Sequence, residues 1–365
     1  MIIPRHQQLI SKIIIQKGKV DRKMENEKKR VLFIDYFKAL LMILVIMGHI
    51  NFANTGIKAW IYSFHMPAFF FVSGMVLNFA PQSNKVGIIK YVDRLIVPFF
   101  LWAMVFASFT YPNLLRIIYG SYSSIAQAGA LTSLWFLPVM FLAVLMLNLI
   151  EKYFNIGSAI WIEIVCIILA FGVGFALPHI KTGYPWSVNV AFIALGFMLL
   201  GRLLKTTAFL FKDFCIKRRH WGWIMCFVLA LLCLSATFIY QFNLTEKGFI
   251  LMGNARYGNP LLFVSCAIFG ILMTMFLSLF IETVLNGRKL GLLSFVGQNT
   301  LCIFAVQKPI IQLFSFINRY VEVPSIVMLI LVTVATLLIS CLICLFFNKY
   351  LPAFVGKGKV FSNQK

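Results

Sequence analysis

Ten stretches of about 20 mainly apolar residues run through this 365-residue chain, and they constrain its fold more than any other feature. A helix of that length spans the hydrocarbon core of a bilayer. In lipid, only helices and closed barrels satisfy the hydrogen bonds of their backbone N–H and C=O groups. The sequence therefore predicts an all-α, polytopic membrane protein with about ten transmembrane helices. The stretches lie near residues 31–50, 60–79, 95–111, 133–150, 160–177, 187–204, 221–241, 260–284, 292–316 and 324–347.

The composition supports this interpretation. Apolar residues make up 61% of the chain and charged residues only 12%, whereas soluble proteins contain about 45–50% and about 25%. A soluble chain of this length could not bury so much apolar surface, so we expect a lipid bilayer as the partner. We expect a multi-pass protein of the cell membrane, the inner or cytoplasmic one.

The basic residues predict the direction in which the helices cross. With ten spans, 25 of the 33 Lys and Arg residues fall on the side of the N-terminus, and six fall on the opposite side. Short cytoplasmic loops are rich in Lys and Arg, so both termini are predicted to be cytoplasmic. The net charge of +22 thus reports orientation. We expect no nucleic acid as a partner, because the basic residues are scattered over short loops and not gathered on one face.

Three parts are expected along the chain. Residues 1–30 form a basic cytoplasmic segment and not a cleaved signal peptide, because they hold no apolar run of sufficient length. Residues 31–350 form the ten-helix membrane domain, and residues 351–365 form a cytoplasmic tail. No metal is expected, since Cys341 and Cys344 lie one helical turn apart but no second pair of ligands accompanies them.

The first span contains three ionisable residues: Asp35, Lys38 and His49. Lys38 and His49 are about 20° apart around the helix and about 16 Å apart along its axis, and Asp35 neighbours Lys38 at i, i+3. Ionisable side chains inside a bilayer are costly and indicate function. The alternative is a structural Asp35–Lys38 ion pair near the interface, with Lys38 snorkelling and His49 capping the outer helix end.

The next two spans add residues at matching depths. His65 enters the second span from outside, at about the depth of His49, and Arg94 enters the third span from the cytoplasm together with Lys85 and Lys90. The alternatives are an interfacial histidine and ordinary positive-inside flanking. Cations at the inner ends and histidines at the outer ends suit a cytoplasmic anionic donor that meets an acceptor at the other face.

These residues and their spacing resemble the acyltransferase-3 family of integral-membrane acyltransferases, and within it the fucose 4-O-acetylase-like carbohydrate O-acetyltransferases. The most specific matches are Asp35-x2-Lys38-x10-His49 and Phe-His-Met-Pro at 64–67, which Ser-Gly follows at 73–74. The resemblance extends from about residue 30 to residue 350. Weaker matches are Arg94 with Pro98, Leu-Trp-Phe-Leu-Pro at 134–138, Tyr-Gly-Asn at 257–259 and Gly-Gln-Asn-Thr-Leu at 297–301.

The resemblance implies transfer of an acyl group, usually acetyl from cytoplasmic acetyl-CoA, to a hydroxyl of a cell-surface or lipid-linked carbohydrate. It implies that Lys38 and Arg94 bind the donor and that His49 and His65 are catalytic. We assign His49 as general base, because a sugar hydroxyl needs one and histidine titrates near neutral pH. His65 would orient the acceptor or stabilise the oxyanion, and Asp35 would hold Lys38 in place. Direct transfer and an acetyl-histidine intermediate both fit.

The chain departs from the family pattern at two positions. Lys38 stands where many relatives have Arg. The lysine keeps the positive charge but lacks the planar fork of a guanidinium group. Gln307, followed by Lys308, stands where many relatives have His, so any role of that histidine differs here. No extracellular esterase-like domain is expected after the last span.

The competing function is transport, namely export of a polysaccharide or small molecule, since polar residues within spans also mark transport paths. Transporters often contain two repeated halves, whereas the charged motifs here crowd into the first three spans, which favours an enzyme. A structural or sensory role would leave Lys38 and His49 unexplained.

The acceptor and the oligomeric state are not predictable from the sequence. Aromatic residues near the predicted outer face would either stack on sugar rings or form the ordinary interfacial belt of membrane proteins. These residues are Trp60, Tyr122, Trp135, Tyr184 and Trp186.

Overall fold

The computed structural model describes residues 31–50, 55–77, 85–129, 131–154, 159–243, 248–317 and 325–362, so the predicted basic segment 1–30 lies outside it. Within these ranges the chain is almost entirely helical, with one isolated bridge between Leu251 and Arg256 and no strand. The helices are α2 (Leu32–His49), α3 (Thr55–Tyr62), α4 (His65–Val76), α5 (Lys85–Tyr91), α6 (Val97–Phe106), α7 (Tyr111–Tyr119), α8 (Tyr122–Gln127), α9 (Phe136–Phe154), α10 (Ile160–Ala176), α11 (Val188–Leu203), α12 (Lys205–Lys217), α13 (Arg219–Thr237), α14 (Pro260–Val284), α15 (Gly291–Gln298), α16 (Thr300–Ile317) and α17 (Ser325–Tyr350).

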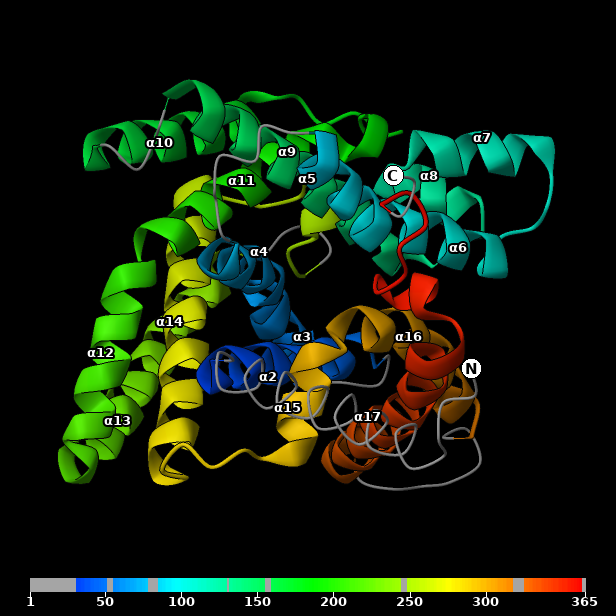
Figure 1. The fold of residues 1–365 in the computed structure, drawn as a ribbon. Coiled ribbons are helices and arrows are strands. Elements are labelled where there is room, and N and C mark those ends of the chain that lie inside the picture. Colours follow the sequence, from blue (N-terminus) through cyan, green and yellow to red (C-terminus); the bar gives the residue numbers. More distant parts are fainter. Residues whose placement is uncertain are drawn as a thin grey trace, which may run out of the picture.

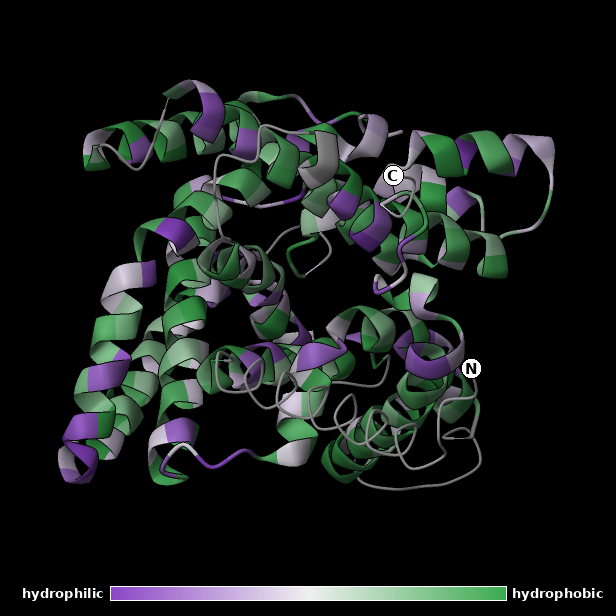
Figure 2. Ribbon diagram, in the orientation of Figure 1, coloured by the Kyte–Doolittle hydropathy of each residue, from purple (hydrophilic) through white to green (hydrophobic). Residues whose placement is uncertain are grey.

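Seven helical segments of the described chain are long and apolar enough to cross a membrane, and α10 and most of α16 are shorter apolar helices. These nine correspond to nine of the ten predicted spans. The prediction of an all-α polytopic membrane protein is confirmed. Figure 2 shows the same pattern, with apolar residues along the helices and hydrophilic residues in the link between α14 and α15.

The third predicted span, 95–111, is the least accurate of the ten. The helix begins earlier, with α5, passes through a π-helical turn at Val92–Ile96 and ends with α6 at Phe106. Beyond it residues 107–110 are not helical, and Pro112 sits in the first turn of α7. Proline fits the start of a helix but not its interior, which explains why a new helix starts here.

Two segments predicted as loops contain helices. The predicted cytoplasmic loop 202–220 contains α12, and the predicted outer loop 112–132 contains α8 and nearly all of α7. α7 leaves Leu114, Leu115 and Ile118 exposed. A short helix with one such apolar face suits the membrane interface and does not span it, which is why hydropathy over a 20-residue window did not detect it.

α2 lies near the centre of the bundle, while α12, α13 and α14 stand side by side along one flank (Figure 1). α2 contacts α4, α14, α15, α16 and α17. Its Phe33, Phe37 and Leu41 side chains are fully buried. Because α2 packs against so many helices, its polar residues face protein and not lipid.

Two predicted spans are broken helices. The second is interrupted at Ser63 and Phe64, between α3 and α4, and the ninth at Asn299, between α15 and α16. His65 is the first residue of α4, directly after the first break. Irregular backbone at membrane depth is tolerated where it is buried in protein or lines a cavity. The breaks therefore point to the region where a site lies.

The tripeptide at 257–259 sets the start of α14. The Asn259 side-chain oxygen accepts hydrogen bonds from the backbone N–H groups of Leu261, at 3.0 Å, and Leu262, at 3.2 Å. Gly258 has a φ of +67°, and an added Cβ would lie 2.3 Å from the Asn243 side-chain oxygen. The role of this motif is thus structural, as a helix cap and a tight turn.

The C-terminal residues fold back onto the bundle. The indole N–H of Trp102 donates to the carbonyl oxygen of Phe354 at 2.9 Å. The Asp93 carboxylate accepts from the backbone N–H groups of Phe361, at 2.9 Å, and Ser362, at 3.1 Å. The Asp93 side chain is buried, and these hydrogen bonds satisfy both of its carboxylate oxygens. The predicted tail is therefore packed against the helices as far as residue 362.

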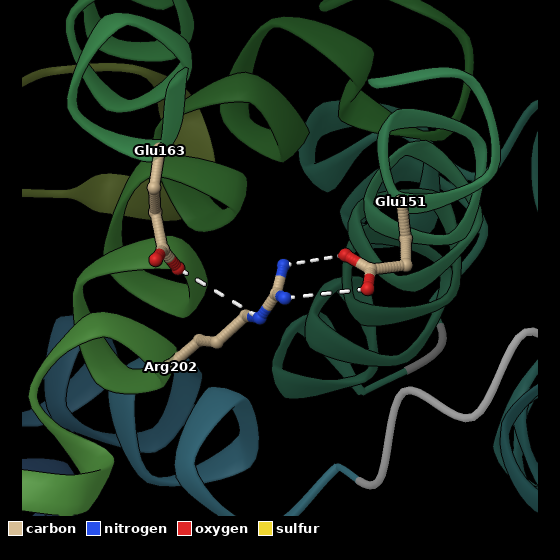
Figure 3. A network of polar contacts seen from close by, with 3 residues as sticks. All are labelled: Glu151, Glu163 and Arg202. Carbon is tan, nitrogen blue, oxygen red and sulfur yellow. Dashed lines mark hydrogen bonds and ion pairs between the residues drawn. The ribbon is translucent and has the colours of Figure 1, made fainter. Parts of the chain in front are cut away.

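A charged network joins three helices (Figure 3). The Arg202 guanidinium on α11 donates to both carboxylate oxygens of Glu151 on α9, at 2.6 and 3.3 Å. Its Nε lies 3.8 Å from Glu163 on α10. Only 9–15% of each of these side chains is exposed. Arg202 thus tethers α9 and α10 to α11.

Two glycines let α4 and α11 approach each other closely. An added Cβ at Gly74 would lie 2.0 Å from the Met198 carbonyl oxygen, and one at Gly201 would lie 2.0 Å from the Phe71 carbonyl oxygen. Since the obstructing atoms belong to the backbone, the helices would have to separate. Small residues serve this purpose at many membrane helix contacts.

We expect Gly74→Ala to destabilise the protein by about 1–3 kcal/mol, the usual cost of overpacking. The measurement is the melting temperature in detergent. Gly172→Ala on α10 is the matched control, because nothing lies within 4 Å of its added Cβ. It should leave the melting temperature unchanged or slightly raised, since alanine favours helix. Equal melting temperatures for the two variants would contradict the close contact.

Candidate active site

A cavity of about 190 Å³ lies at the His49 end of α2, the end predicted to face outward. We call it the outer cavity. His49 and His65, predicted at similar depth, both line it. The other polar or aromatic residues around it include Lys58, Tyr62, Tyr122, Thr132, Trp135 and Lys308.

The two histidines differ in their hydrogen bonds. His65 Nδ1 lies 2.7 Å from the Ile61 carbonyl oxygen. A carbonyl only accepts, so Nδ1 carries the proton and Nε2 of the neutral ring is left as an acceptor. His49 Nδ1 is buried and makes no hydrogen bond of good geometry within the described chain, although the Gln307 side chain lies close to His49. A buried nitrogen of this kind needs an explanation, and a place for a ligand or a proton transfer is one.

Tyr62 packs against both imidazoles. Its ring centroid is 6.3 Å from that of His49 and 5.0 Å from that of His65, edge to face in each case. Tyr62 is the last residue of α3, and His65 is the first of α4. The break in the second span therefore presents both side chains to α2.

A second cavity, of about 450 Å³, lies nearer the end of α2 that is predicted to face the cytoplasm. We call it the inner cavity. It brings Lys38 and Arg94 together, as the predicted donor site requires. Met66 and Phe304 line both cavities and therefore lie between them. The polar residues around the inner cavity are Lys38, Ser73, Arg94, Gln298, Thr300 and Lys357.

Asp35 lines neither cavity among the residues described for them. Its carboxylate accepts from the Ser294 hydroxyl at 3.1 Å and from the Gln298 carboxamide at 3.0 Å. Gly297 lets α15 approach, since an added Cβ there would lie 2.0 Å from the Asp35 carbonyl oxygen. Asp35 is thus placed to position α15 and Gln298, and its predicted role toward Lys38 stays a prediction.

The C-terminal segment contributes Lys357 to the inner cavity, a residue that sequence reasoning missed. Its ammonium group donates to the side-chain oxygens of Asn299, at 2.9 Å, and Asn348, at 2.6 Å. Asn299 stands at the break between α15 and α16. The motif at 297–301 gave a signal of a polar site here, but nothing in the tail itself indicated a partner.

Sequence reasoning also missed the place of two lysines at the outer cavity. Lys58 falls between the predicted spans 31–50 and 60–79, and Lys308 falls in the predicted ninth span, but neither position alone indicates a function. In the structure Lys58 lies 5.5 Å above the Phe249 ring, and Lys308 donates to the Thr132 hydroxyl. The available signal was a lysine inside an apolar span, which is rare without function.

The five aromatic candidates divide into two groups. Tyr122 and Trp135 line the outer cavity. Trp60 donates its indole N–H to the Thr237 hydroxyl at 2.8 Å, and Trp186 donates to the Ile118 carbonyl oxygen at 2.8 Å. Tyr184 does not line this cavity either, so of the five only Tyr122 and Trp135 are placed to contact a sugar there.

Comparison with known proteins agrees with this arrangement. A family model described as an acyltransferase domain, Acyl_transf_3, matches residues 31–345. A search of the curated proteins found no match. The matched range contains His49, His65, Lys38 and Arg94 and most of both cavities. A multi-pass membrane chain matched over most of its length by this domain belongs to the acyltransferase-3 family.

Proposed function

We propose that the protein is a membrane O-acetyltransferase that moves an acetyl group from cytoplasmic acetyl-CoA to a hydroxyl of a cell-surface or lipid-linked carbohydrate. The fucose 4-O-acetylase-like enzymes that its motifs resemble do the same type of chemistry. One observation carries the proposal: the cavity lined by Lys38 and Arg94 adjoins the cavity lined by His49 and His65, at Met66 and Phe304.

On the donor side, acetyl-CoA is anionic because of its phosphates, and Lys38, Arg94 and Lys357 supply cations at the inner cavity. Charge-assisted hydrogen bonds to phosphate are among the strong ones. Apolar side chains such as Phe69 and Phe136 complete the wall and suit the uncharged pantetheine arm. The thioester would then reach the boundary between the cavities.

On the acceptor side, His49 would act as general base. It takes the proton of the acceptor hydroxyl as the oxygen attacks the thioester carbonyl. The carbon–sulfur bond then breaks, and the proton passes to the leaving thiolate. Neutral His65, with its proton held by the Ile61 carbonyl, can accept a hydrogen bond but not donate one from Nε2. This favours a role in orienting the acceptor hydroxyl over a role as an oxyanion donor.

The test is acetyl-CoA turnover by the purified protein in lipid nanodiscs with carbohydrate acceptors. An acyltransferase releases free CoA and forms an acetyl ester. An exporter leaves acetyl-CoA unchanged and moves an unmodified carbohydrate across the membrane. Carbohydrate transport without CoA release would therefore favour the competing function.

We expect Lys38→Ala and Arg94→Ala each to raise the KM for acetyl-CoA about tenfold or more, because each removes a charge-assisted contact to a phosphate. The measurement is the initial rate as a function of acetyl-CoA concentration. Lys217→Ala is the matched control, since this exposed lysine on α12 lines neither cavity. An unchanged KM in both Lys38→Ala and Arg94→Ala would contradict the donor site.

A further inference from the structure

The charge around the outer cavity is one-sided. Lys58 enters from α3 and Lys308 from α16, beside the two histidines. None of the described residues that line this cavity is acidic. In the proposed function, the cations at the inner cavity bind the phosphates of the donor. The two lysines at the outer cavity can therefore bind a different anion.

Both lysines contact uncharged groups. Lys308 donates to the Thr132 hydroxyl, and Lys58 lies over the Phe249 ring. Neither lysine forms an ion pair with a described residue. Each side chain is only partly exposed. A cation withdrawn from water is costly unless an opposite charge compensates it.

Two further observations indicate a ligand in this place. His49, at the same cavity, has a buried Nδ1 that makes no hydrogen bond of good geometry within the described chain, with the Gln307 side chain as its polar neighbour. Tyr122 and Trp135 add aromatic faces to the wall, and such faces suit a sugar ring. At about 190 Å³, the space is smaller than the usual pocket for a drug-sized ligand, so it fits one sugar residue and not an oligosaccharide.

We propose that the acceptor is an anionic carbohydrate, whose carboxylate or phosphate group binds Lys58 and Lys308 while its hydroxyl lies against His49. This inference rests on the proposed function and names the class of acceptor. The bond changes are those of acetyl transfer, and the anionic group takes no part in them. Its contact with the lysines holds the sugar so that one hydroxyl faces the base.

The experiment compares acceptors that differ only at carbon 6. Methyl glycosides of glucose, galactose and mannose are supplied with a hydroxyl, a carboxylate or a phosphate at that position. The purified protein in nanodiscs receives each one together with acetyl-CoA. We expect kcat/KM to be roughly tenfold to a hundredfold higher for the charged acceptors of at least one sugar. The carboxylate and phosphate arms identify which anion is preferred.

Substitutions then connect this preference to the two lysines. Lys58→Gln and Lys308→Gln should each lower the preference for charged acceptors about tenfold, and Lys308→Arg should retain most of it. Lys181→Gln is the control, because Lys181 is an exposed lysine of a predicted outer loop that does not line the cavity. Elution as a single peak in size-exclusion chromatography confirms that each variant is folded.

Three results would overturn the proposal. They are equal rates for neutral and charged acceptors, a preference that survives both glutamine substitutions, and an equal loss for every acceptor. An equal loss for every acceptor would mean that the lysines stabilise the oxyanion that forms during acetyl transfer.

Binding of the same glycosides, measured by calorimetry without acetyl-CoA, separates this inference from the proposed function. Lysine-dependent binding of charged glycosides without any acetyl transfer would support the anionic site while contradicting the acetyltransferase. Acetyl transfer to neutral acceptors, with no binding of charged glycosides, would support the acetyltransferase while contradicting the anionic site.

Discussion

Replacing His49 with Ala should lower acetyl transfer by about 10² to 10⁴-fold, the range that a general base contributes. The acceptor hydroxyl would then have to lose its proton to water, and the cavity would keep its donor site intact. The measurement is the rate of acetyl ester formation at saturating acetyl-CoA. The substitution replaces the imidazolylmethyl side chain by a methyl group and leaves α2 in place. Because the donor cavity is unchanged, the KM for acetyl-CoA should change little.

His179→Ala is the matched control for this prediction. His179 lies in a predicted outer loop, is exposed and lines neither the outer nor the inner cavity. It should transfer acetyl at the natural rate. Near-normal transfer by His49→Ala would remove His49 as the base, and His65, with Nε2 left as an acceptor, would be the next residue to test.

Replacing Arg202 with Ala should destabilise the protein by about 3–5 kcal/mol, the cost of removing one partner from a buried ion pair. The substitution leaves the Glu151 and Glu163 carboxylates without the cation that lies between them (Figure 3). Because these residues belong to α9, α10 and α11, the loss should loosen that side of the bundle. The measurement is thermal unfolding in detergent.

A compensating variant shows whether charge is the cause. Adding Glu151→Gln and Glu163→Gln to Arg202→Ala removes the unpaired charges and should restore much of the stability. Arg218→Ala, at an exposed arginine that packs on the Phe214 ring, should stay within about 0.5 kcal/mol of the natural protein. A melting temperature for Arg202→Ala as high as that of Arg218→Ala would contradict the role of the network.

Hydropathy predicted most of the fold, because a bilayer imposes a length and an apolar composition on each helix that crosses it. The fold class is confirmed. Seven of the ten predicted spans match helical segments long and apolar enough to cross a membrane, and two more match shorter apolar helices of the described chain. Errors occur where apolar length is not the deciding factor. The third span is shifted toward the N-terminus, where α5 carries charged residues, and α7 is too short for the search window.

Part of the candidate site was also predictable. The helical period of α2 and the alternating direction of the spans predict that Lys38 lies at the depth of Arg94 and that His49 lies at the depth of His65. The structure places each of these pairs at one of two adjoining cavities. Their chemical roles stay predictions. The spacing along one helix is fixed by geometry, so it could be read without knowledge of the other helices.

The remaining site residues depend on contacts between segments distant in sequence. Lys357 reaches the inner cavity because Trp102 and Asp93 hold the C-terminal segment. Lys308 faces the histidines because the ninth span breaks at Asn299 and α16 begins there. A sequence pattern with a helical period contains no information on either arrangement.

The most direct test of the central claim is to measure the acetyl content of the cell-surface carbohydrate in a strain from which the gene is deleted. The strain is complemented with the natural gene or with the His49→Ala variant, and the acetyl content of the isolated carbohydrate is measured by NMR spectroscopy. Acetyl transfer predicts that the acetyl signal is lost in the deletion strain, returns with the natural protein and stays absent with His49→Ala, while the amount of carbohydrate is unchanged. An unchanged acetyl content per sugar, with less carbohydrate at the surface, would contradict the account and indicate export.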